Sequence, residues 1–94
     1  AALAQAQNKD AAEAISRVRE MNRDRCALSR LTERYAEAKS NGNQVDQKEI
    51  EGRMRELNDR IATQMAHLPR LTKAMAVNSS EGRQLQQEMQ AVCR

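Results

Sequence analysis

Apolar side chains recur at steps of three and four along most of the chain, and this spacing predicts amphipathic helices. The first such run opens with a capping signal, Asp10 followed by Glu13, and continues to Lys39 without a glycine or proline. We therefore predict a helix over residues 10–39. The next four residues, 40–43, read Ser-Asn-Gly-Asn and tolerate the left-handed conformation in which helices end.

A second helix is predicted over residues 46–76, because the capping pattern returns at Asp46 and Glu49. Its apolar positions alternate steps of three and four, which is typical of a coiled-coil seam. Pro69 lies inside this run, removes a backbone donor and clashes with the preceding turn. Because the seam keeps its phase past the proline, we expect a kink there. The seam consists of Ile50, Met54, Leu57, Ile61, the polar Gln64, Leu68, Leu71 and Met75.

A third helix is predicted over residues 79–93, after a third capping signal at residues 78–81. Short connections make consecutive helices antiparallel neighbours. The sequence therefore predicts an all-α fold, a long antiparallel helical hairpin with a shorter third helix packed back along it. Residues 10–94 would form this single, three-helix bundle-like domain.

The composition shows how little apolar material such a fold has for its core. Of 94 residues only 1% are aromatic, and the chain contains no Phe or Trp. So small a core needs further stabilisation. With turns near residues 42 and 78, Cys93 falls about five residues, or roughly 7 Å, from the level of Cys26. A small stagger would absorb this offset, so we expect a Cys26–Cys93 disulfide; the alternative is two buried thiols.

The expected disulfide and the first residues both indicate export. Residues 2–4 and 4–6 fit the small-residue pattern that precedes a signal-peptidase cut. We expect residues 1–9 to be an export-signal remnant or, alternatively, a frayed alanine-rich helical turn. Disulfides persist in oxidising compartments, which predicts a periplasmic or secreted protein. No apolar run of about 18 residues is present, so no membrane span is expected.

Charge and chemistry disfavour several classes of function. The 16 basic and 13 acidic residues are interleaved, which is typical of solvated helix faces. The most basic segment, residues 17–25, contains Glu20 and Asp24 and so does not favour nucleic-acid binding. His67 is the single histidine and lacks a neighbouring nucleophile or metal-ligand cluster. We therefore predict no catalytic residue, no metal ligand and no cofactor.

These observations predict a non-catalytic, exported bacterial protein that binds another protein. Such a protein could be a secretion or envelope assembly component, a periplasmic chaperone, or an inhibitor or immunity protein. Two alternatives stay open: a structural oligomer driven by the seam, and a cytosolic nucleic-acid-binding protein using residues 17–25. Near the first turn the hairpin would be covered from one side only, and Tyr and Arg are frequent interface hot spots. The predicted partner-binding residues are Leu31, Arg34, Tyr35, Ala38, Ile50, Arg53, Met54 and Leu57.

Overall fold

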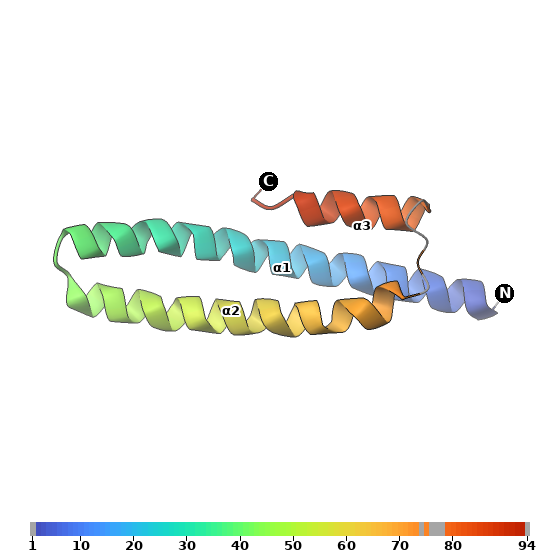
Figure 1. The fold of residues 1–94 in the computed structure, drawn as a ribbon, viewed down its shortest axis with the longest axis horizontal. Coiled ribbons are helices and arrows are strands. Elements are labelled where there is room, and N and C mark those ends of the chain that lie inside the picture. Colours follow the sequence, from blue (N-terminus) through green and yellow to red (C-terminus); the bar gives the residue numbers. More distant parts are fainter. Residues whose placement is uncertain (1, 74, 76–78, 94) are drawn as a thin grey trace.

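Three helices make up the computed structural model of the chain (Figure 1). They are α1 (Ala2–Ser40), α2 (Gln44–Thr72) and α3 (Ser80–Gln90). The structure describes the backbone of residues 2–73, 75 and 79–93, and the side chains of 9–73, 75 and 79–93, and contains no strand within these ranges. The predicted all-α fold, a long hairpin with a short third helix lying back along it, is confirmed.

The helix boundaries differ from the predicted ones for local reasons. Helix α1 begins well before Asp10, because the alanines of its first turns favour helix, and Asp10 lies inside the helix. Helix α2 begins before Asp46 because Asn43 is the N-cap, and its Oδ1 accepts a hydrogen bond from the Asp46 N–H at 3.1 Å. At Pro69 the helix continues as far as Thr72, while positions 74 and 76 of the predicted helix lie outside the described residues. Helix α3 ends before the predicted residue 93.

The turn between α1 and α2 is a Schellman motif that ends the first helix. The Asn43 N–H donates to the Ala38 carbonyl at 2.9 Å, and the Gly42 N–H donates to the Lys39 carbonyl at 3.2 Å. Gly42 has a φ of 69°, which a residue without a Cβ adopts at little cost. The chain therefore reverses within a few residues and brings α2 back along α1.

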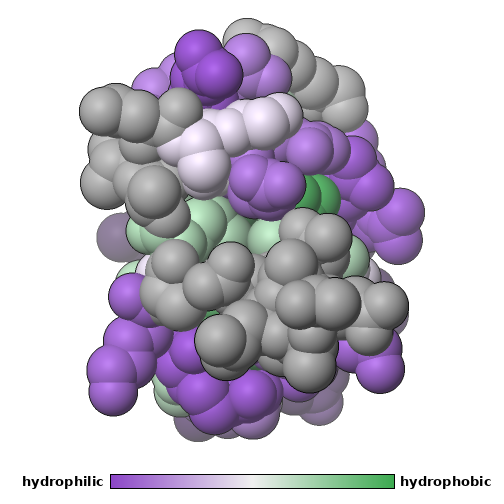
Figure 2. Space-filling model, turned by 90° about the vertical axis from the view of Figure 1, so that its right-hand side faces the viewer, coloured by the Kyte–Doolittle hydropathy of each residue, from purple (hydrophilic) through white to green (hydrophobic). Residues whose placement is uncertain are grey.

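The core is divided into two clusters along the hairpin. The first lies where α3 covers the hairpin, and it draws on all three helices. The second lies at the turn and draws on α1 and α2 alone. In the end-on view of Figure 2, hydrophobic side chains lie between the helices and hydrophilic ones cover the outside. The buried members are Ala14, Ile15, Val18, Met21, Leu71 and Leu85 in the first cluster, and Leu31, Ala38 and Ile50 in the second.

Polar contacts between α1 and α2 lie beside the first cluster, at Gln64, and between the two clusters, at Asp24. Asp24 is only 6% exposed, and its Oδ1 accepts from Arg60 Nη2 at 2.7 Å. Gln64, the polar member of the seam, accepts from Arg17 at 2.9 Å and donates to Glu20 at 2.8 Å. A displaced register would separate these partners and leave buried polar groups unpaired, so the contacts favour one alignment of the two helices.

Helix α3 packs against α1 alone. Among the described residues, no Cα atom of α3 comes within 8 Å of one in α2. Leu85 is the buried residue of α3, Arg19 forms an ion pair with Glu88 at 3.0 Å, and the Asn22 side chain donates to the Glu88 carbonyl. The predicted disulfide is present, with the Cα atoms of Cys26 and Cys93 5.0 Å apart. It fastens the end of the short helix to the middle of the long one.

We predict that replacing both cysteines, Cys26→Ala with Cys93→Ala, lowers the free energy of unfolding by about 4 kcal/mol. The disulfide closes a loop across 67 positions and so removes much of the entropy of the unfolded chain. Urea denaturation without reductant, followed by helical circular dichroism, measures the change. Reductant should shift the wild-type midpoint and leave that of the double variant unmoved. Equal midpoints for the two oxidised proteins would contradict the prediction.

We predict that Arg60→Ala destabilises the protein by about 1 to 2 kcal/mol, because it leaves the Asp24 carboxylate buried without its cation. Arg55→Ala is the matched control on the same helix, since Arg55 is exposed and has no polar partner among the described residues. The control should change the free energy of unfolding by less than about 0.5 kcal/mol. Similar losses in both variants would show that the Arg60–Asp24 pair has no special role.

Candidate protein-binding surface

The half of the hairpin nearest the turn is not covered by α3. Helix α3 ends beside the middle of α1, close to Cys26, and the two long helices continue past it to the turn (Figure 1). Over this part of the molecule the described structure consists of α1 and α2 alone. The surface predicted from the sequence lies here.

An open groove runs between α1 and α2 in this uncovered half. Its volume is about 600 Å³. Leu31, 7% exposed, and the half-buried Leu57 provide apolar surface, and exposed arginines surround them. An apolar floor with guanidinium groups at its edge can bind apolar and acidic side chains together, because guanidinium groups donate paired hydrogen bonds to carboxylates. The lining residues are Ala27, Arg30, Leu31 and Arg34 of α1 and Arg53, Glu56 and Leu57 of α2.

The structure brings some of the predicted partner-binding residues to this groove and places others elsewhere. Leu31, Arg34, Arg53 and Leu57 line it. Three groove residues were missed by the sequence reasoning, namely Ala27, Arg30 and Glu56, although Arg30 stands one helical turn before Arg34. Ala38 and Ile50 are buried in the second core cluster, and Tyr35 and Met54 pack against that cluster. These four residues stabilise the hairpin and do not line the groove.

Tyr35 connects the two helices near the turn. Its hydroxyl donates to Glu51 Oε1 at 3.0 Å. This hydrogen bond, together with the negative charge of Glu51, raises the pKa of Tyr35 above its ordinary value of 10.0. The hydrogen bond therefore favours the neutral form of the phenol.

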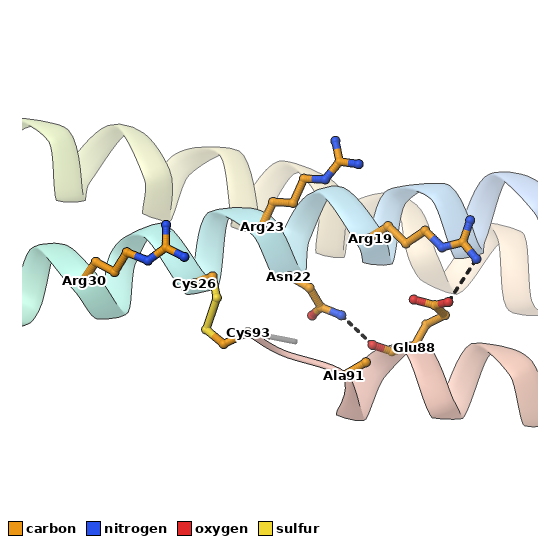
Figure 3. A pocket seen from close by; sticks show the side chains of 8 residues that line it. All are labelled: Arg19, Asn22, Arg23, Cys26, Arg30, Glu88, Ala91 and Cys93. Carbon is orange, nitrogen blue, oxygen red and sulfur yellow. Dashed lines mark hydrogen bonds and ion pairs between the residues drawn. A yellow bond between two sulfur atoms is a disulfide. The ribbon is translucent and has the colours of Figure 1, made fainter.

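A second groove adjoins the first beside the disulfide. It has a volume of about 450 Å³ and lies between α1 and the end of α3 (Figure 3). Arg30 lines both grooves. In Figure 3 the Arg23 side chain points away from α3 and the Arg30 side chain runs along α1 toward Cys26, whereas Arg19 bends toward Glu88. The other residues that line this groove are Asn22, Cys26, Ala91 and Cys93.

The basic segment 17–25 does not form one surface. Arg17 bonds Gln64 of α2, whereas Arg19 pairs with Glu88 of α3. The acidic residues within the segment also turn toward α2, where Glu20 meets Gln64 and Asp24 meets Arg60. Arg17 and Arg19, which the sequence places together, therefore point toward different helices.

The described residues include no group of three or more His, Cys, Asp or Glu side chains placed to hold a metal ion. Both cysteines are in the disulfide, and His67 is half-buried on α2. No helix in the described part of the chain is long and apolar enough to cross a membrane.

Comparison with known proteins yields no relative. No protein-family model, curated protein or solved structure matches this chain significantly. The groove must therefore be interpreted from its own geometry.

We predict that Tyr35 ionises at a higher pH in the folded protein than in the unfolded chain, and that Glu51→Ala removes most of the difference. A raised folded pKa means that this contact stabilises the fold below the ordinary tyrosine pKa and is lost as pH rises through the folded value. Ultraviolet absorbance reports Tyr35 alone, since the chain has one Tyr and no Trp. Glu56→Ala, on the same helix, is the control and should leave the titration unchanged. A wild-type midpoint equal to that of the unfolded chain would contradict the hydrogen bond.

Proposed function

We propose that the protein is a non-catalytic binding module that holds a segment of another protein in the groove between α1 and α2. The observation that carries this proposal is the groove itself, with Leu31 and Leu57 at its floor and Arg30, Arg34 and Arg53 around them. Both walls are rigid helices, so the surface is formed before a partner arrives. Preorganisation of this kind lowers the entropy lost on binding.

The proposal includes export to an oxidising compartment, the periplasm or the exterior of a bacterial cell. The Cys26–Cys93 disulfide supports this location, because cytosolic thiols are kept reduced. A small module locked by a disulfide and lacking a metal cluster among its described residues fits an assembly component, a periplasmic chaperone or an inhibitor. Each of these roles requires a stable surface and no chemistry of its own.

Site-specific photo-cross-linking in cells that produce the protein tests the proposal. We predict that a photoreactive residue in place of Glu56, in the groove, forms a discrete adduct with one other protein. The same residue in place of Met65 is the matched control, since Met65 is 51% exposed on α2 and does not line the groove. The control should form little or no adduct.

A second variant shows whether the groove floor makes the contact. Leu57→Gln should reduce the adduct formed from position 56 while circular dichroism shows that the helices remain. An adduct consisting of two copies of this chain would replace the proposal with self-association. Equal adducts from positions 56 and 65 would contradict a specific groove.

A further inference from the structure

Four arginines of α1 follow one another at steps of four, seven and four: Arg19, Arg23, Arg30 and Arg34. Residues at these steps lie on one face of a helix. This face passes through both grooves, with Arg19 and Arg23 in the groove beside the disulfide, Arg34 in the groove near the turn, and Arg30 in both. We call these four residues the arginine stripe.

The acidic residues of α1 form no ion pair with the stripe among the described residues. Asp24 faces α2 and is bound to Arg60, and Glu20 is bound to Gln64 of α2. Glu33 and Glu37 lie exposed on α1 near Arg30 and Arg34, and neither makes an ion pair with a described residue.

Most of the stripe has no polar partner in the part of the chain that the structure describes. Arg23, Arg30 and Arg34 are exposed and make no hydrogen bond or ion pair with a described residue. Arg19 is paired with Glu88. The three unpaired guanidinium groups extend about 16 Å along the helix axis, which is the length of about three helical turns.

The surroundings of the stripe favour a protein partner over a nucleic acid. Leu31 and Leu57 give the groove an apolar floor. Single-stranded nucleic acids bind proteins largely by stacking on aromatic side chains. The one aromatic residue, Tyr35, is engaged with Glu51. An acidic segment that also carries apolar side chains matches both the charge and the floor.

We propose that the occupant of the groove is an acidic, amphipathic segment of a partner protein, with carboxylates on Arg23, Arg30 and Arg34 and apolar side chains on Leu31 and Leu57. This inference rests on the proposed function and names the chemistry of the partner. The segment lies along α1 past the end of α3. It thereby extends the helical layer that α3 begins.

The test uses three labelled helical peptides of about 18 residues, a length that spans the stripe with room at both ends. One contains Leu and Glu at amphipathic spacing, and in the other two Gln or Lys replaces every Glu. Fluorescence anisotropy of the oxidised protein measures their binding. We expect the Glu peptide to bind most tightly, and its affinity to fall as salt rises.

Two triple variants of equal net charge give the decisive comparison. Arg23→Gln with Arg30→Gln and Arg34→Gln should weaken binding of the Glu peptide by about tenfold or more, because each exposed charge pair contributes a factor of a few. The control removes three exposed charges outside both grooves and should change binding little. It combines Lys48→Gln, Arg55→Gln and Arg83→Gln.

Three results would overturn the inference. Equal weakening by both triple variants would show a response to net charge alone. Tighter binding of a single-stranded oligonucleotide through the same three arginines would identify a nucleic-acid surface. Equal binding of the Gln and Glu peptides, lost in Leu57→Gln, would show that the carboxylates are irrelevant. In that last case the proposed protein-binding function stands, and the cross-link from position 56 tests it separately.

Discussion

The covalent bond between Cys26 and Cys93 is the constraint that fixes the short helix α3 against the long hairpin. Helix α3 contains 11 residues, and an isolated helix of that length is marginal in water. Its other attachments to α1 are modest, with Leu85 buried and Glu88 contacting Arg19 and Asn22. Helix α3 packs on α1 alone. The position of the disulfide therefore also determines how far along α1 helix α3 reaches. Everything from that point to the turn is a two-helix structure.

The position of polar residues along α1 connects this architecture to the surface it presents. A core without Phe or Trp leaves room for polar side chains between the long helices. Asp24 and Glu20 occupy that position, where Arg60 and Gln64 satisfy them. Both acids therefore contact α2, and neither forms an ion pair with the arginines on the outer surface of α1.

Much of the fold could be predicted from the sequence. The spacing of apolar residues, and the number of residues between each position and the nearest turn, can be read directly from the chain. The seam of α2, the three-helix order and the disulfide all followed from spacing. The helix starts were less predictable. Asp10 carries the same capping pattern as a true N-cap, yet preceding alanines extend the helix through it, and Asn43 competes successfully with Asp46. Local signals rank candidate caps poorly when a neighbouring residue offers another one.

The binding surface was the harder part to predict, and the reason is geometric. Spacing identifies which residues share a face, but not whether a partner helix of the same chain covers it. Ala38 and Ile50 were expected at the partner-binding surface, but both are buried in the core cluster between α1 and α2. Arg30 was overlooked, although it is the residue that joins the two grooves. Its position becomes significant only once α3 is known to end beside Cys26.

The two grooves therefore differ in what maintains them. The groove near the turn is built from α1 and α2, whose side chains form a core cluster without α3. The groove beside the disulfide has Glu88, Ala91 and Cys93 in its wall, and these residues stay in place only while α3 is attached. An apolar floor is thus intrinsic to the hairpin, whereas the groove that Arg19 and Arg23 line takes its other wall from the end of α3 and the disulfide.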